Sequence, residues 1–266
     1  MHRMLTPTDV TSIRVSVAAS IARPSVCVPP DTVVVSMTGG KQTALRPLQF
    51  SQVKSRRCLL QRVVSLCFGN YTDEFGTCVG ARALPQVVGP AQYHRVTWSK
   101  WQLLHAALQE ARAALFVDAD VLLLRNPFHT PSILLARFFG RDAARHEALL
   151  YQYEGPGSNP LNSGQLFARS LDAVSDVLAE QPVYFDGDTP LDQEIAFRAL
   201  NRHGHRTARL PDAFAGNCWF GPPEAPPWCS LITFHGHCTG SLQEKLTRLR
   251  LVLRETTQCH ELVVGT

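Results

Sequence analysis

The chain has 266 residues, which is enough for one sizeable domain with a full hydrophobic core or for two small ones. Its hydrophobic fraction of 45% and charged fraction of 18% are typical of a soluble globular protein and exclude a disordered chain. The net charge of +4 is modest and the arginines are scattered without a basic run, so nucleic-acid binding has little support and an anionic small substrate fits equally well.

Residues 1–30 contain several basic residues and serines but only one acidic residue, Asp9. This composition resembles a weak targeting leader, and it fits an irregular extension of the folded domain equally well. We leave these two alternatives open and expect the folded domain to span residues 31–266. No apolar stretch of the sequence is long enough to cross a membrane.

From residue 32 to residue 118 the sequence predicts alternating strands and helices. The helix at 97–112 has the clearest period, because Trp101, Leu104 and Leu108 fall on one face. Such alternation is typical of a parallel sheet with helical crossovers, in which ligands bind beyond the carboxyl ends of the strands. In chain order, the predicted elements are strand 32–37, helix 44–61 with Pro47 in its first turn, strand 62–68, helix 97–112 capped by Thr97 or Ser99, and strand 114–118.

After Pro127 the pattern is less regular. Residues 161–168 read as a polar loop that enters a strand, and the Pro-rich residues 211–228 read as an irregular excursion. The other predicted elements are helical or mixed pieces at 133–139 and 142–150, a loop at 155–160, a helix at 171–180, a helix at 191–200 capped by Asp188 or Thr189, a strand at 231–234, and a final helix that opens at Ser241 with a capping box.

Eight cysteines are many for a cytosolic enzyme, and they form no Cys-x-x-Cys pair that would indicate a zinc ribbon. The count is typical of an oxidising lumen, and we expect disulfides within the C-terminal group of cysteines at 218–259. The sequence does not determine which cysteines pair. Asn70 begins a glycosylation sequon, which is consistent with secretion.

Two carboxylates, Asp118 and Asp120, stand one residue apart where an apolar run ends. In a strand, residues i and i+2 share a face, so the two side chains would point the same way. Two carboxylates that close repel and raise each other's pKa unless a cation compensates them. The pair therefore indicates a divalent metal that holds a diphosphate, although aspartates that merely end the strand in a solvated turn explain the same pattern.

Polar residues elsewhere in the sequence could join this pair. His235 and His237 follow a predicted strand, and an imidazole beside two carboxylates suits Mn²⁺ or a similar ion. Lys100 and Lys245 stand near helix starts, where a phosphate is favoured. Each of these residues also has an ordinary interpretation as a solvated or hydrogen-bonded side chain. The same holds for two further groups, the polar turn Asn162-Ser163-Gly164 and the pair Asp192-Gln193 in the first turn of a helix.

The order of these motifs, rather than any one of them, resembles a known family. It is similar to the nucleotide-diphospho-sugar transferases of the GT-A fold, nearest to the plant and algal cell-wall xylosyl- and arabinosyltransferases. The resemblance covers residues 31–256 and implies an α/β fold, with a Rossmann-like, mixed but mostly parallel sheet flanked by helices in a single domain. The motifs that carry it are Lys100-Trp101, Asp118-Ala119-Asp120, Asn162-Ser163-Gly164, Asp192-Gln193, His235-Gly236-His237 (where the family usually ends in asparagine) and Lys245.

The resemblance also implies a role for each motif. Asp118 and Asp120 match the family's Asp-x-Asp, which holds Mn²⁺ on the donor diphosphate, and His235 matches the histidine that completes the metal shell. Asp192 and Gln193 match the pair beside the anomeric carbon, which we assign as catalytic. The other expected donor contacts are Asp118, Lys100 and Lys245 near the phosphates, Thr38 at the nucleoside, and Asn162, Ser163 and Gly164 at the sugar.

The function that this resemblance implies is metal-assisted, retaining transfer of a sugar from a nucleotide-diphosphate donor, UDP-linked, to a hydroxyl of a glycan or glycoprotein. The family and the cysteine count together suggest the Golgi lumen or the secretory pathway. A haloacid-dehalogenase-like phosphatase is an alternative, because residues 187–192 imitate its second acidic motif, but Leu122 stands where those enzymes use Thr or Val. A non-catalytic homologue that binds a sugar nucleotide is the other alternative.

Overall fold

The computed structural model describes residues 5–53, 57–68, 77–81, 90–128, 147–153, 160–182, 189–216, 228–237, 239 and 241–264. The strands are β1 (Thr32–Gly39), β2 (Val63–Phe68), β3 (Thr77–Ala81), β4 (Ala113–Val117), β5 (Val121–Leu123), β6 (Leu149–Tyr153), β7 (Leu161–Ala168), β8 (Thr207–Arg209), β9 (Phe214–Gly216) and β10 (Thr233–His235). The helices are α1 (Pro7–Ile21), α2 (Arg46–Gln49), α3 (Arg57–Leu60), α4 (Pro90–Leu108), α6 (Leu171–Ala179), α7 (Asp192–Arg202) and α8 (Leu242–Val264), with 3₁₀ turns at Gly40–Leu45 and Trp228–Ser230.

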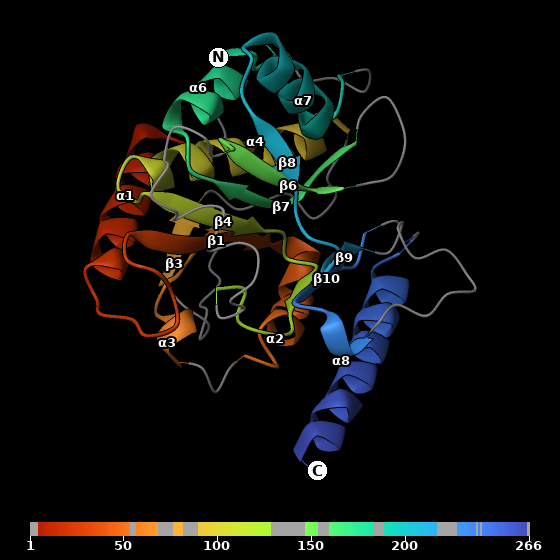
Figure 1. Ribbon diagram of the computed structural model, residues 1–266. Coiled ribbons are helices and arrows are strands. Elements are labelled where there is room, and N and C mark those ends of the chain that lie inside the picture. The colour runs from red at the N-terminus through yellow and green to blue at the C-terminus, as the bar shows by residue number, and fades with distance from the viewer. Residues whose placement is uncertain are drawn as a thin grey trace.

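Within the described residues, a seven-stranded sheet has the order β3-β2-β1-β4-β7-β6-β8 (Figure 1). The first four strands of this order run parallel to one another, whereas β7 runs antiparallel to both β4 and β6. β1, β2 and β4 are buried along their whole length, as expected of continuous apolar strands that are covered on both faces. The predicted mixed, mostly parallel α/β sheet is confirmed.

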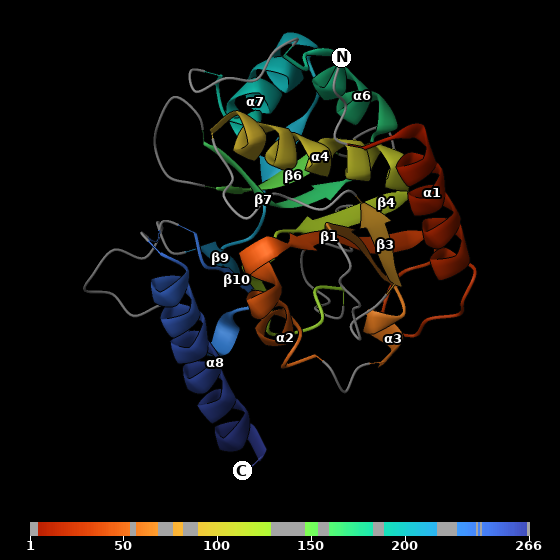
Figure 2. The same ribbon diagram turned by 180° about the vertical axis from the view of Figure 1, so that it is seen from behind.

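Successive residues of β1 point to opposite faces of this sheet. Val33 and Val35 belong to a core cluster that includes residues of α1, α4, α6 and α7. Val34, between them, packs on the other side with Phe50 and Phe128. Figures 1 and 2 show α4, α6 and α7 on one side of the sheet and α2 and α3 on the other, so the sheet is the middle of three layers.

A smaller sheet of three strands, β5-β10-β9, begins where β4 ends. β10 pairs antiparallel with β5 and parallel with β9. Helix α8 covers this sheet, with Leu249 and Val252 packed in one cluster with Phe234 of β10, and its far end extends away from the rest of the molecule (Figure 2). The smaller sheet therefore extends the fold at the carboxyl end of β4.

Residues 7–21 form helix α1, although we expected a leader or an irregular extension over residues 1–30. Pro7 occupies the first helical position, and Thr6 and Asp9 form a complete capping box. Ile13 and Val17 are fully buried in the same cluster as the face of α4. This burial, which the low amphipathic periodicity of the stretch does not reveal, is the physical reason for the helix. The position of the domain boundary at residue 31 stays a prediction.

Two helix predictions in the first half are wrong in their extent. The helix predicted at 44–61 is interrupted: within its described residues, single helical turns form at 46–49 and 57–60, and residues 50–53 form a turn that buries Phe50 and Val53 in the core. The helix predicted at 97–112 starts earlier, at Pro90, and ends at Leu108. Thr97 and Ser99 are therefore not caps but bond to carbonyl oxygens of the preceding turn. Strand β3 was not predicted.

In the second half, most elements agree with the prediction. Residues 171–179 and 192–202 are helical, and the hydroxyl of Ser241 accepts the N–H of Glu244 at the start of α8. Some details differ: Leu149 and Leu150, the end of the helical or mixed piece predicted at 142–150, lie in β6, α7 begins after Leu191 without a side-chain cap, and β8 and β9 were not predicted. The predictions that lie outside the described residues are the sequon at Asn70, the piece at 133–139, most of the piece at 142–150, the loop at 155–159, the cap at Asp188 and most of the Pro-rich excursion at 211–228.

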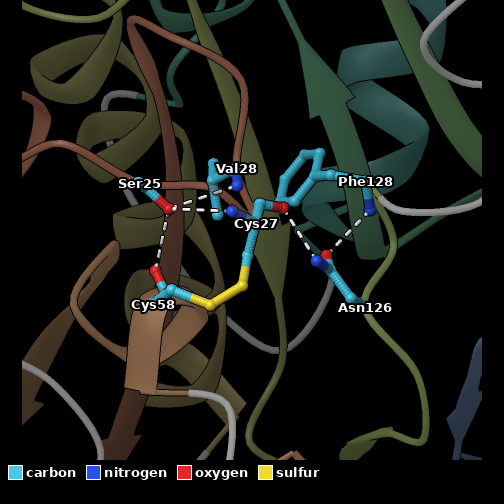
Figure 3. The surroundings of a disulfide bond; sticks show 6 residues. All are labelled: Ser25, Cys27, Val28, Cys58, Asn126 and Phe128. Carbon is cyan, nitrogen blue, oxygen red and sulfur yellow. Dashed lines mark hydrogen bonds between the residues drawn. A yellow bond between two sulfur atoms is a disulfide. The ribbon is translucent and has the colours of Figure 1, made fainter.

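Two disulfides join segments of the N-terminal half, Cys27 to Cys58 and Cys67 to Cys78. Figure 3 shows how the first is embedded: the Ser25 hydroxyl donates to the Cys58 carbonyl oxygen, and the Asn126 amide donates to the Cys27 carbonyl oxygen over 2.7 Å. The disulfide therefore ties the entry to β1 to α3, and the Asn126 hydrogen bond ties the same segment to the chain after β5. Of the C-terminal cysteines that we expected to pair, Cys229 is disulfide-bonded.

Among the described residues, no helix combines the length and the apolar character that a membrane crossing requires.

Two valines of α1 give a matched test of its packing. Val17 is fully buried, whereas Val15 is 64% exposed on the same helix. Val17→Ala removes two buried methyl groups and should lower the free energy of unfolding by about 2 kcal/mol, as measured by urea unfolding. Val15→Ala should change it by less than about 0.5 kcal/mol. Equal effects of the two substitutions would show that α1 does not belong to the core.

Candidate functional site

A tight turn between β4 and β5 carries the two aspartates. β4 ends at Val117, and the Val121 N–H then donates to the carbonyl oxygen of Asp118 over 3.0 Å. The Asp118 N–H donates to the Gly164 carbonyl oxygen of β7 over 2.8 Å, which anchors the turn to the sheet. The strand does not continue through the pair as expected, so a turn, rather than strand alternation, brings the two carboxylates together.

His235 lies beside these carboxylates because of the pairing of the smaller sheet. Its partner on β5 is Val121, the residue that follows Asp120. The His235 Nε2 atom is 3.3 Å from Oδ1 of Asp120. One ligand atom from each of Asp118, Asp120 and His235 lies within 4.8 Å of the others, so these three residues form a group that could hold a metal ion.

Asp120 is the most strongly held member of this group. Its Oδ2 atom contacts Nζ of Lys245, in the first turn of α8, and its carbonyl oxygen accepts the Gly236 N–H over 2.8 Å. Burial would raise the pKa of Asp120, but His235 and Lys245 outweigh burial and hold the pKa well below its usual range. Asp120 is therefore a buried anion between two basic side chains.

Lys100, on α4, is the second buried cation of the site. Its Nζ atom lies 3.6 Å from Oδ2 of Asp118 and 3.5 Å from Oδ2 of Asp192, and it donates to the Ser163 hydroxyl over 2.8 Å. Burial would lower the pKa of Lys100, but the two carboxylates outweigh it and raise the pKa above its usual value. The Trp101 indole N–H donates to Asp192 over 3.1 Å. Lys100 thus links α4, the β4 turn, β7 and α7.

The two aspartates of the motif differ in their electrostatic surroundings. Burial raises the pKa of Asp118. Lys100 lowers this pKa, whereas the carboxylate of Asp120 raises it, and the net result is a pKa above the usual value. Asp118 is the more exposed of the two, with 26% of its side chain accessible against 8% for Asp120. An additional positive charge would therefore stabilise the ionised form of Asp118 more than that of Asp120.

A bulge in β7 carries the Asn162-Ser163-Gly164 segment, which is part of the strand and not the turn that we expected. β6 pairs Tyr151 with Leu166 and its next residue, Gln152, with Asn162, so residues 163–165 have no counterpart in β6. The Asn162 side-chain oxygen accepts the Gly164 N–H over 2.8 Å. A Cβ atom on Gly164 would lie 2.1 Å from Cε1 of His235, so only glycine lets the imidazole approach this closely.

Thr38 and Gln193 are the remaining residues predicted for the site. Thr38 is buried near the carboxyl end of β1, and its hydroxyl makes no hydrogen bond within the described part of the chain. Gln193 is half-buried on α7, next to Asp192. Direct contacts join seven of the other predicted residues into two sets, Lys100 with Asp118, Ser163 and Asp192, and Asp120 with His235 and Lys245. Asn162 bonds to Gly164, whose carbonyl oxygen accepts the Asp118 N–H.

Sequence reasoning missed several supporting residues. Gln49 donates from Nε2 to the Asp118 carbonyl oxygen over 2.8 Å, and its own Oε1 accepts from the fully buried Arg46 over 2.7 Å. Trp101 appeared in the sequence as a core residue of a predicted helix and as part of the Lys100-Trp101 motif, but its hydrogen bond to Asp192 was not predicted. His237 was named with His235 in the sequence analysis, but its contact was not predicted: it stacks on His235 with ring centroids 4.3 Å apart, and burial together with the neighbouring His235 lowers the pKa of His237 to about 3. An interrupted helix gave no periodic signal for Arg46 and Gln49.

Removal of the Lys100 charge should destabilise the protein. Lys100→Met leaves the carboxylates of Asp118 and Asp192 without their shared cation, and the loss of one member of a buried ion pair costs about 3–5 kcal/mol. Urea unfolding at neutral pH should show a loss of this order. Arg198→Met removes a cation from an exposed pair with Glu194 and should change the stability by less than about 0.5 kcal/mol. A neutral effect of Lys100→Met would contradict the assignment of Lys100 as the buried cation.

Comparison with known proteins gives one family match. A model of the family described as nucleotide-diphospho-sugar transferase matches residues 79–249. These residues include every member of the two contact sets described above. No curated protein gives a significant match to the chain.

Two solved structures have a similar fold. A glycosyltransferase involved in the glycosylation of the major capsid of PBCV-1 is 16% identical with a TM-score of 0.53, and the match covers 83% of this chain and 98% of that one. An active-site mutant of LgtC is 12% identical with a TM-score of 0.50, and the match covers 84% of this chain and 95% of that one. At such low identities the likeness concerns the fold, and it confirms the expected GT-A fold.

Proposed function

The chain belongs to the nucleotide-diphospho-sugar transferase family, and from this premise we propose that it transfers a sugar from a nucleotide-diphosphate donor, UDP-linked, to a hydroxyl of a glycan or glycoprotein. The observation that carries the proposal is the pair of cations, Lys100 and Lys245, on either side of the Asp118-Asp120-His235 group. A site with this charge pattern suits a polyanionic ligand that arrives with a divalent cation.

The chemistry of the donor set fits such a cation. Two carboxylates and one imidazole are a mixed oxygen and nitrogen set, which suits Mn²⁺ or a similar ion. We assign Asp118, Asp120 and His235 as its ligands. The carboxylates of Asp118 and Asp192 share the ammonium of Lys100, so a further positive charge would be favourable on this side of the site. When bound, the cation would neutralise charge on the donor diphosphate and on the nucleoside diphosphate that leaves.

The protein's own residues have distinct parts in this proposal. Lys100 and Lys245 lie beside the diphosphate and stabilise the charge that develops as the sugar–phosphate bond breaks. Asn162, Ser163 and Gly164 line the donor sugar, and the hydroxyl of Thr38 binds the nucleoside. Ser163 is held by Lys100, so the sugar-binding segment and the phosphate-binding cation are positioned together.

Asp192 and Gln193 are proposed to act at the anomeric carbon, with retention of configuration. The Trp101 indole N–H and the Lys100 ammonium both lie at Oδ2 of Asp192. These contacts hold the carboxylate in one orientation, so that Asp192 stabilises an oxocarbenium-like sugar electrostatically. The carbonyl oxygen of the Gln193 side chain adds a second partial negative charge on the same side.

The compartment that we propose is the lumen of the secretory pathway, and the Golgi in particular. Two disulfides are consistent with an oxidising lumen. Of the alternative functions, the family match does not favour a haloacid-dehalogenase-like phosphatase, whose second motif would also include residues outside the described part of the chain. A binding protein without turnover is the other alternative, and the experiment below distinguishes it.

The proposal predicts metal-dependent turnover of a nucleotide sugar. A panel of nucleotide sugars should be screened for donor hydrolysis and for transfer, with Mn²⁺ and after its removal by a chelator. At least one UDP-sugar should be turned over only with the cation present. Asp120→Ala, which removes a proposed ligand and the partner of Lys245, should reduce turnover at least about 100-fold.

Asp212→Ala is the matched control for this substitution, because its side chain is 83% exposed and pairs only loosely with Arg209. It should retain full turnover. Full activity of Asp120→Ala would refute the site. Thermal stabilisation by UDP with Mn²⁺, without turnover of any donor, would instead indicate the binding protein.

A further inference from the structure

A buried chain of hydrogen bonds leads from the core of the protein to the ring of His235. It passes from Thr233 on β10 to Gln165 on β7, then to Gln152 on β6, and then to Nδ1 of His235. All four side chains are at least nine-tenths buried. None of the three residues before His235 belongs to the group proposed to hold the metal or the donor.

The direction of each hydrogen bond follows from one fixed acceptor, the carbonyl oxygen of Ala215. Because a carbonyl oxygen only accepts, the Gln165 atom that lies 3.2 Å from it must be the amide nitrogen. The Gln165 oxygen then accepts the hydroxyl proton of Thr233. The second N–H of Gln165 donates to Oε1 of Gln152 over 3.1 Å, so the orientation of the Gln152 amide is fixed as well.

The same reasoning extends to the imidazole. Oε1 of Gln152 lies 2.8 Å from Nδ1 of His235, and an amide oxygen only accepts, so Nδ1 must carry a proton. In the neutral ring, Nε2 then has the lone pair, and it faces Oδ1 of Asp120 at 3.3 Å. A lone pair that faces a carboxylate oxygen is unfavourable unless Nε2 is protonated as well or a cation lies between the two atoms, so the neutral ring favours a cation at this position.

We propose that Gln165 and Gln152 are positioning residues, which hold His235 in the tautomer with its proton on Nδ1 and its lone pair on Nε2, directed at Asp120. This inference rests on the proposed function, because the lone pair is useful only if a divalent cation binds there. Hydrogen bonds to the second nitrogen of a metal-bound histidine generally set both the tautomer and the ring orientation.

Two glycines show how tightly this arrangement is packed. A Cβ atom on Gly164 would lie 2.1 Å from the His235 ring, and one on Gly216 would lie 2.0 Å from Nε2 of Gln152. Nε2 of Gln152 makes no hydrogen bond within the described residues, although it is buried. A flipped Gln152 amide would point its N–H groups at both Gln165 Nε2 and His235 Nδ1. The unsatisfied nitrogen is the cost of keeping the oxygen directed at His235.

The tautomer can be read directly in metal-free protein. Long-range proton–nitrogen NMR correlation spectra of ¹⁵N-histidine-labelled protein distinguish the two tautomers, and loss of the signal in His235→Asn assigns it. The spectra should be recorded at rising pH until the ring is neutral. We expect His235 with its proton on Nδ1. A proton on Nε2 in the wild-type protein would overturn the proposal, whether or not any variant folds.

Variants at position 152 separate the hydrogen bond from packing. Gln152→Met removes the acceptor at similar volume, so the Nδ1 tautomer should no longer dominate and Mn²⁺ affinity, measured by electron paramagnetic resonance of the free ion, should fall about 10- to 100-fold. Gln152→Glu keeps an acceptor for both Gln165 and His235 and should retain the tautomer. Gln165→Met should weaken the preference for the Nδ1 tautomer. Gln52→Met, at a half-buried Gln bonded to Thr257, is the control and should change neither measurement.

The outcomes also separate this inference from the proposed function. If Gln152→Met leaves both the tautomer and the Mn²⁺ affinity unchanged, the positioning role is wrong. If the wild-type protein has the Nδ1 tautomer, loses it in Gln152→Met and yet binds no Mn²⁺, the hydrogen-bond chain is supported while the proposed metal site is refuted.

Discussion

The site depends on the mutual compensation of buried charges. Three carboxylates lie close together, those of Asp118 and Asp120 in the turn between β4 and β5 and that of Asp192 at the start of α7. The ammonium groups of Lys100 and Lys245 lie among them. Buried charges are tolerated only when they are paired and hydrogen-bonded. The two lysines come from α4 and α8, which contact different sheets, so their contacts with the aspartates connect the central layer to the C-terminal part of the molecule. Loss of a charge would therefore affect stability as well as chemistry.

The geometry of the strands explains why these residues meet. Parallel β1, β2 and β4 end at one edge of the central sheet, and the short turn after β4 leads at once into β5 of the smaller sheet. β10 then brings His235 back beside that turn, and the bulge in β7 supplies a glycine where the imidazole needs space. Bulges of this kind are common next to active sites, because they redirect side chains without ending the strand. Membership of the nucleotide-diphospho-sugar transferase family agrees with this architecture.

The sequence predicted the parts of the molecule that have strong local signals. Continuous apolar runs identified β1, β2 and β4, and the spacing and order of the motifs identified Asp118, Asp120 and His235 as one group, which the structure brings within 4.8 Å. Other features depend on tertiary contacts, which produce no periodic pattern in the sequence. Helix α1 forms because α4 covers it, and the strand character of Ser163 arises from pairing across a bulge. The polar partners Gln152 and Gln165 were invisible for the same reason, since a buried glutamine in a strand resembles a surface residue in sequence.

The most direct test of this account is a crystal structure of the protein soaked with Mn²⁺ and UDP, with anomalous diffraction measured to locate the manganese. We predict a single strong anomalous peak among the side chains of Asp118, Asp120 and His235, in contact with the diphosphate, with Nε2 of His235 as the nitrogen ligand. A peak at another site, or UDP bound with no manganese beside these residues at saturating concentration, would contradict the central claim.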